Sequence, residues 1–130
     1  MKFVLLIHST PRPWGHPTSD HVAEHQALPR EQRDQLNAEF EAVMAEMQAN
    51  GELIGGEALA DPAAATLFRW QAGERIASSG PYTEAEEQLA GFFLLDVASR
   101  ARAEQIAASF SGPGETVELR PAMWPGGDDR

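Results

Sequence analysis

LAGFFLLDV, residues Leu89–Val97, is a short run whose apolar side chains fall on both faces of an extended chain. Such a run is typical of a strand that other parts of a protein cover on both sides. The opening segment Lys2–His8 has the same character and is rich in residues that favour strands. Both segments are therefore predicted to be central strands of one sheet.

Two helices are predicted beside these strands. Between Pro29 and Asn50 the apolar residues recur at helical spacing, and most acidic residues fall on the other side. Pro29 suits the first helical turn, and Asn50-Gly51 suits the end of the helix. A second helix follows Ser99, a good N-cap, with Ala103, Ile106, Ala107 and Phe110 inward, and it ends at Ser111–Gly114.

Four further strands complete the prediction: Glu52–Ala60, Ala65–Trp70, Glu74–Ser79 and Thr116–Pro121. The second and third are joined by a turn at Ala72-Gly73 and form a hairpin. In the last strand Val117 and Leu119 alternate with Glu118 and Arg120, as in a half-exposed edge strand. Thr83–Glu86 has the form of a capping box, which predicts a short helical turn.

The order β-α-β, hairpin, β-α-β predicts an α+β fold, a ferredoxin-like sandwich with an additional β-hairpin. Two helices cover one face of such a sheet, yet the central strands are apolar on both faces. The expected cover for the second face is another copy of the chain, so a homodimer is predicted. Residues 1–122 are expected to form the domain, and residues 123–130 a tail rich in Pro, Gly and Asp.

Length and charge limit the function. The chain has 130 residues, a mass of 14.2 kDa and a formal net charge of -10. An acidic chain of this kind repels phosphate backbones and anionic lipid surfaces, so neither nucleic acid nor membrane is an expected partner. Cysteine is absent, which excludes disulfides and thiolate chemistry. No stretch has the length of a membrane span and no cleavage site follows the first strand, so a cytoplasmic location is expected.

Residues Ser78–Asp96, SSGPYTEAEEQLAGFFLLD, resemble the signature of the YCII-related, DGPF-domain family. That signature comprises an Asp-Gly-Pro-Phe element, an acidic segment ending in Glu-Gln-Leu, and a Gly-Phe-aromatic strand. The opening strand, the Asn50–Leu53 helix end and Val117–Pro121 support the resemblance, which spans about residues 1–122. It implies a dimeric α+β barrel with a pocket between sheet and helices. The activity of DGPF-type members is mostly unassigned, and some of their genes neighbour alternative sigma factors.

The sequence departs from this family pattern at several positions. Ser79 stands where the motif has Asp, Tyr82 where it has Phe, and His8 where most relatives have Tyr. The resemblance to smaller YciI-type members implies a His-Asp pair, whose positions fall near Phe40 and near Ser109 or Phe110 here. Neither partner is present, so that pair is not carried over to this chain.

His8 is the candidate catalytic residue, because it ends a central strand, where ligand pockets tend to form, and imidazole can act as acid or base. A histidine that is merely hydrogen-bonded at the strand end is the alternative. Candidate ligand-binding residues supply flat rings, a phenol or guanidinium groups: Trp14, Tyr82, Arg69 and Arg120. Each also has a structural interpretation, as a core ring, a turn residue or a partner of acidic side chains.

Four histidines, His8, His16, His21 and His25, lie close together in the sequence. His16, His21 and His25 offer imidazoles for a divalent metal, with His21 and His25 at i, i+4 spacing. No His-Glu-x-x-His motif accompanies them, and Gly55-Gly56 lacks the spacing of a phosphate loop. No cofactor is therefore expected, and metal binding by this loop stays an alternative.

Three functions are compatible with these residues. The first is a small-molecule pocket protein, with or without catalysis by His8, as the family resemblance implies. The second is a non-catalytic regulatory or interaction module, associated through the resemblance with alternative sigma-factor systems. The third is a metal-binding module that uses the histidine-rich loop. No complete catalytic constellation is visible in the sequence, so binding is favoured over catalysis.

Overall fold

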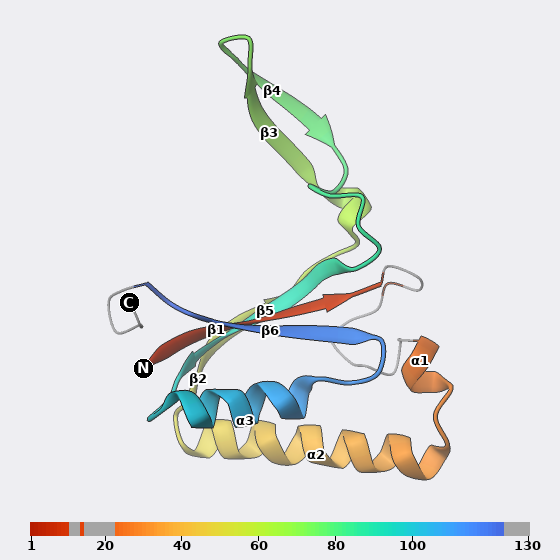
Figure 1. The fold of residues 1–130 in the computed structure, drawn as a ribbon, viewed down its shortest axis with the longest axis vertical. Coiled ribbons are helices and arrows are strands. Elements are labelled where there is room, and N and C mark those ends of the chain that lie inside the picture. Colours follow the sequence, from red (N-terminus) through yellow and green to blue (C-terminus); the bar gives the residue numbers. More distant parts are fainter. Residues whose placement is uncertain (11–13, 15–22, 124–130) are drawn as a thin grey trace.

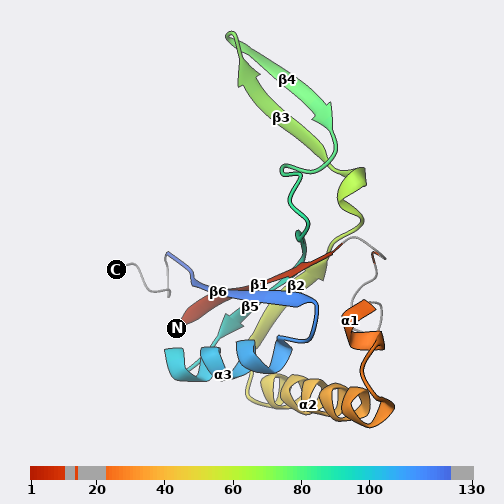
Figure 2. The same cartoon turned by 45° about the vertical axis from the view of Figure 1, so that its right-hand side comes forward.

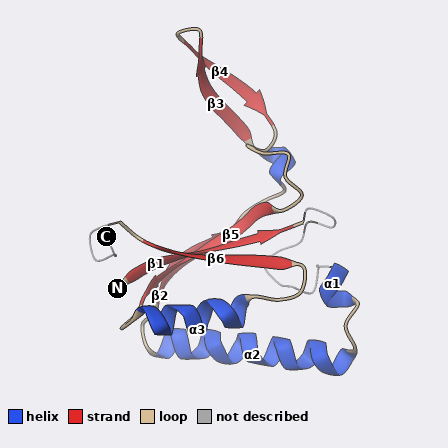
Figure 3. Ribbon diagram, viewed as in Figure 1, coloured by secondary structure: helices blue, strands red, loops and turns tan. Residues whose placement is uncertain are grey.

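The structure, a computed structural model, describes residues 1–10, 14 and 23–123. In chain order its elements are β1 (Lys2–Ser9), α1 (Ala23–Gln26), α2 (Arg30–Ala49), β2 (Leu53–Ala58), η2 (Pro62–Ala64), β3 (Thr66–Gln71), β4 (Glu74–Ser79), β5 (Gln88–Asp96), α3 (Arg100–Phe110) and β6 (Glu115–Pro121). Figure 3 shows where helices, strands and loops lie.

Four strands form an antiparallel sheet in the order β2-β5-β1-β6. Helices α2 and α3 lie together on one face of this sheet (Figure 1). The architecture is α+β and compatible with a ferredoxin-like fold, which confirms this part of the prediction. The two strands predicted to be central, β1 and β5, are indeed the two inner strands.

The hydrophobic core fills the layer between sheet and helices. Along β1 the side chains alternate, so that Phe3, Leu5 and Ile7 are buried against the helices. From the helices, Val43 and Met47 meet them, as do three side chains of α3: Ala103, Ile106 and Phe110. The apolar stripes identified in the two predicted helices therefore face this core.

The helix ends follow the predicted capping residues. Pro29 precedes the first turn of α2, and after Asn50 the chain turns at Gly51, whose φ of +68° suits glycine. At the start of α3 the Ser99 hydroxyl accepts a hydrogen bond from the Arg102 backbone N–H at 3.1 Å. Both helix boundaries predicted from the sequence are thus confirmed.

Two glycines allow β2 to lie close to β5. A Cβ at Gly56 would be 2.5 Å from the Phe92 carbonyl oxygen, and a Cβ at Gly91 would be 2.8 Å from the Glu57 carbonyl oxygen. These distances are too short for real side chains, so both positions require glycine unless the strands move apart. The glycine of the Gly-Phe-aromatic stretch therefore has a packing role.

The helical turn predicted at Thr83–Glu86 is wrong. Here the chain makes a turn in which the Thr83 hydroxyl accepts a hydrogen bond from the Ala85 N–H at 3.2 Å. The Gln88 side-chain amide donates to the carbonyl oxygens of Thr83 and Ala85, both at 2.8 Å. Because β5 begins at Gln88, the segment is too short to continue into a helix, and side chains bind its backbone groups instead.

Strands β3 and β4 form a separate two-stranded sheet, here called the arm (residues 66–79). Its turn is the predicted one: Ala72 and Gly73 both have positive φ, as in the tight turns that join two antiparallel strands. The arm projects from the side of the four-stranded sheet away from α2 and α3 (Figures 1 and 2). The sequence predicted the hairpin but not its separation from the sheet.

Two aromatic side chains are exposed as a result. Trp70 lies in strand β3, where a tryptophan is usually a core residue, but it is 63% exposed on the arm. Tyr82 is 80% exposed in the connection after β4. Among the described residues, no helix is long and apolar enough to cross a membrane.

Candidate functional site

The second face of the sheet, here called the open face, points away from α2 and α3. On β1 it carries the alternate side chains Val4, Leu6 and His8, which are only half-buried. The register places Val4 beside Leu94 and Leu6 beside Phe92, so β5 extends the apolar surface. Within the described part of the chain no helix covers this face (Figure 2). The prediction that the central strands are apolar on both faces is confirmed.

Polar side chains gather at one end of the open face, where His8 lies. His8 Nε2 is 3.4 Å from Glu118 Oε1 of the neighbouring strand β6. The register pairs His8 with Thr116 and Leu6 with Glu118, so the two polar groups meet diagonally across the strands. The predicted acid–base residue thus has a carboxylate partner.

Arg120 holds this carboxylate from the other side. Its Nε donates to Glu118 Oε2 at 3.0 Å, and its terminal nitrogen contacts the same oxygen. Hydrogen bonding from Arg120, with a smaller contribution from His8, holds the pKa of Glu118 below its ordinary value despite partial burial. Glu118 is therefore ionised at neutral pH. Its carboxylate can accept a hydrogen bond from a protonated nitrogen of His8.

A second contact closes the same end of the sheet. Thr116 Oγ1 donates to Glu87 Oε2 at 2.9 Å. Glu87 comes just before β5 and Thr116 belongs to β6, so this hydrogen bond spans the intervening strand β1. We call the set His8, Glu87, Thr116, Glu118 and Arg120 the polar end.

The structure brings four of the predicted site residues together in two separate pairs. His8 and Arg120 meet through Glu118, whereas Arg69 lies on the arm, with its guanidinium 5.7 Å from the centre of the Tyr82 ring. Trp14 Nε1 donates to the Leu59 carbonyl oxygen at 3.0 Å, between β2 and the arm. The other three predicted site residues therefore lie on or near the arm, away from the polar end: Arg69, Tyr82 and Trp14.

The expected pocket between sheet and helices is not where His8 lies. That layer contains the core, whereas His8 points to the open face because of the alternation along β1. The positions where the family resemblance implies a His-Asp pair lie in the same layer. There the rings of Phe40 and Phe110 pack 5.1 Å apart, and Phe93 meets Phe110 at 5.2 Å. This region has apolar packing in place of acid–base groups.

The histidine-rich loop is only partly described. His16 and His21 lie outside the described residues, and His25 is buried in the short helix α1. Among residues 1–10, 14 and 23–123, no three His, Asp or Glu side chains are grouped so as to hold a metal ion. Because two of its three histidines lie outside the described residues, the metal-binding alternative stays an untested prediction.

A shallow hollow lies at the N-terminal half of α2, where Leu28, Gln35, Leu36 and Glu39 face Pro113. Among the described residues that line it, Glu39, an exposed carboxylate, is the one ionisable group. Acid–base chemistry needs groups that influence one another, and the hollow provides none. The polar end is the stronger candidate.

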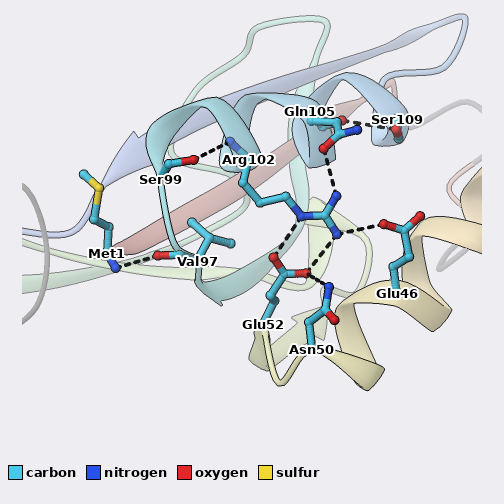
Figure 4. A network of polar contacts seen from close by, with 9 residues as sticks. All are labelled: Met1, Glu46, Asn50, Glu52, Val97, Ser99, Arg102, Gln105 and Ser109. Carbon is cyan, nitrogen blue, oxygen red and sulfur yellow. Dashed lines mark hydrogen bonds and ion pairs between the residues drawn. The ribbon is translucent and has the colours of Figure 1, made fainter.

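A partly buried polar cluster surrounds Arg102 (Figure 4). Arg102 Nε and a terminal nitrogen donate to the two oxygens of Glu52 at 2.8 and 2.9 Å, and Glu46 and Gln105 also contact the guanidinium. Hydrogen bonding from Arg102 lowers the pKa of Glu52. The cluster joins α3 to the end of α2 and the start of β2, so its role is to hold these elements together.

Sequence reasoning missed Glu118 and Glu87 as site residues. Glu118 was identified only as a residue of a half-exposed edge strand, and Glu87 follows a segment that was predicted to be a short helical turn. The sequence shows that polar and apolar residues alternate around Glu118, and that His8 lies on the same strand face as Val4 and Leu6. That His8 and Glu118 meet depends on the register between β1 and β6, which local patterns do not provide.

Comparison with known proteins identifies the family. The YCII-related domain matches residues 1–118. The chain belongs to the YCII-related family. It is also 33% identical over 98 residues to an uncharacterized protein of Rhizobium meliloti (strain 1021), a match that covers 73% of this chain and 79% of that protein. The resemblance found in Ser78–Asp96 is confirmed, and neither match names a ligand or an activity for this YCII-related chain.

Proposed function

We propose that this protein binds a small molecule at the polar end of the open face, with His8 as the acid–base group. The observation that carries the proposal is the contact between His8 Nε2 and Glu118 Oε1 beside the apolar strip of β1 and β5. Binding sites typically combine an apolar surface with a few convergent polar groups. The polar end and the apolar strip beside it together have this composition.

The chemistry of the polar end follows from its partners. Arg120 keeps Glu118 ionised, and Oε1 of this carboxylate lies 3.4 Å from Nε2 of His8. A protonated Nε2 facing the carboxylate would leave Nδ1 as the nitrogen that takes up or returns a proton. A matching ligand has an apolar part for the strip and an ionisable group for His8 and Arg120.

A second copy of the chain is the proposed cover for the open face, which makes the working unit a homodimer. Val4, Leu6, Phe92 and Leu94 form a continuous apolar surface on the two inner strands. Exposed apolar surfaces of this kind mark interaction sites, and a symmetric dimer pairs the same surface on both chains. The cover would also exclude water from the apolar strip beside His8.

The site is tested by NMR titration with phenylacetate, a probe that joins an apolar ring to a carboxylate. We expect chemical-shift changes at Leu6, Leu89 and Thr116. His8→Gln should raise the dissociation constant about fivefold, because a hydrogen bond to the ligand is lost.

Lys2→Gln is the matched control. Lys2 lies on the same strand and face as His8 but at the other end, and its removal should change the dissociation constant less than about twofold. The proposal fails if the shifts concentrate at Leu28 and Leu36, if no residue responds, or if His8→Gln binds as well as the unmodified protein.

A further inference from the structure

The arm presents its aromatic residues to solvent. The register of β3 and β4 places Phe68 and Trp70 on one face with Ala77 and Arg75, because paired residues share a face. Phe68 is 75% exposed and Trp70 is 63% exposed, and every residue of β4 is exposed. We call Phe68, Trp70, Arg75 and Ala77 the aromatic face of the arm.

An isolated two-stranded hairpin is at best marginally stable in water. The arm lies outside the core cluster and projects beyond the four-stranded sheet (Figures 1 and 2). Aromatic residues and arginine are enriched at protein interfaces, where they contribute most of the binding energy. The aromatic face therefore has the composition of a protein-binding surface.

The charge of the arm differs from that of the chain. Arg69 and Arg75, two of the ten basic residues, lie here with Glu74, one of the 20 acidic residues. In the described chain the two guanidinium groups lie over rings, Arg69 at 5.7 Å from Tyr82 and Arg75 at 4.6 Å from Trp70, and no carboxylate pairs with them. A positively charged arm on a chain of net charge -10 is complementary to another copy of that chain.

The position and length of the arm fit the same partner. The arm rises on the side of the open face, which is the side where a second copy would lie (Figure 1). Six residues per strand extend the arm about 20 Å, whereas two packed sheets lie about 10 Å apart. The tip therefore reaches past the partner's sheet to the layer of its helices. There the exposed side of α2 is rich in carboxylates: Glu31, Asp34, Glu39, Glu41 and Glu46.

We propose that each arm clasps a second copy of this chain, with its aromatic face, which includes Arg75, against the acidic helical side of the partner. The proposal rests on the homodimer proposed above and adds a second contact to the open-face interface. It accounts together for the exposed aromatic rings, for Arg75 without a carboxylate partner in the described chain and for the direction of the arm.

Photo-crosslinking tests where the arm binds. The chain has no cysteine, so Gln71→Cys at the tip of the arm takes a benzophenone maleimide at one position. Unlabelled and ¹⁵N-labelled chains are mixed, illuminated, digested and examined by mass spectrometry. We expect crosslinks from one chain to peptides of α2 in the other. Crosslinks that stay within one chain, or that join only arm to arm, overturn the proposal.

Sedimentation measures the strength of the contact. Phe68→Ser with Trp70→Ser should raise the dimer dissociation constant about thirtyfold or more, because buried aromatic anchors contribute strongly to interfaces. Met123→Ser is the control: Met123 is also 63% exposed but lies outside the arm, and its change should be less than about twofold. Added salt should weaken the unmodified dimer more than an Arg69→Gln, Arg75→Gln variant.

Substitutions on the open face and on the arm distinguish the two proposed dimer contacts. Leu94→Glu places a charge on the open face and should abolish the dimer if that face is the main interface. A dimer that Leu94→Glu disrupts and the arm variant leaves unchanged overturns the clasp alone. An unmodified chain that stays monomeric at about 100 µM overturns both proposals, because even a weak specific contact would form there.

Discussion

The four-stranded sheet and the arm are both antiparallel, yet they place their apolar side chains differently. Phe3 and Leu5 of β1 are buried beneath two helices, whereas Phe68 and Trp70 of β3 are exposed. The sheet is held by a core and by the partly buried Arg102–Glu52 ion pair, and the arm is held by its own strand pairing. The difference shows that the core is built from sheet and helix residues, and it is the basis for the proposal that arm residues make contacts outside the fold.

The largest expected contrast compares two isoleucines. Ile106 of α3 is 0% exposed, and Ile76 of the arm is 40% exposed. Ile106→Ala should lower the free energy of unfolding by about 3–4 kcal/mol through lost burial and the cavity left behind. Ile76→Ala should lower it by less than about 1 kcal/mol. Urea denaturation measures both, and equal losses would show that the arm belongs to the cooperative core.

A neighbouring pair of glycines tests the contact between β2 and β5. Gly56→Ala should cost about 2 kcal/mol, because its Cβ would lie 2.5 Å from the Phe92 carbonyl oxygen. Gly55→Ala meets nothing within 4 Å and should change stability by only a few tenths of a kcal/mol. Thermal unfolding compares the two variants. If the two variants unfold at the same temperature, β2 and β5 do not lie as close together as described.

A pH-dependent contrast tests the Arg102 cluster. Glu52→Gln should cost about 2 kcal/mol at pH 7, since Arg102 would lose its buried carboxylate partner. Because the pKa of Glu52 is lowered on folding, its contribution is present above the unfolded value of about 4.3 and is lost as the pH falls through the folded value. The difference in free energy of unfolding between the variant and the unmodified protein should therefore become smaller below about pH 4.3.

Glu104→Gln is the matched change at an exposed position. Glu104 Oε1 lies 3.3 Å from Arg100 Nε in an i, i+4 pair on the surface of α3. Its loss should cost less than about 0.5 kcal/mol. Urea denaturation across the pH range separates the two glutamates, and a Glu52→Gln cost as small as that of Glu104→Gln would contradict the stabilising role of the cluster.

Local patterns were sufficient for most of the fold. Apolar residues on both faces identified β1 and β5 as inner strands, and Pro29, Gly51 and Ser99 marked the helix ends. These features depend on residues close in sequence, so spacing and capping chemistry predict them. The Thr83–Glu86 prediction was wrong because Gln88, outside the motif, binds the carbonyls that a helix would use.

The placement of side chains between distant elements was less predictable. Trp70 has the local pattern of a strand residue, but its exposure depends on whether the hairpin joins the main sheet. The contact between His8 and Glu118 depends on register, and a slip of one residue would move Glu118 to the other face. The exposure of Trp70 and the contact of His8 with Glu118 both depend on how strands distant in the sequence pair. The periodicity of a single sequence does not reveal that pairing.

The most direct test of the proposed assembly is the molar mass of the unmodified chain, measured by multi-angle light scattering at micromolar concentration. If a second copy covers the open face and is clasped by the arm, the mass will be twice the 14.2 kDa of one chain. A mass of one chain throughout the micromolar range would contradict the account and leave the open face and the arm without their proposed partner.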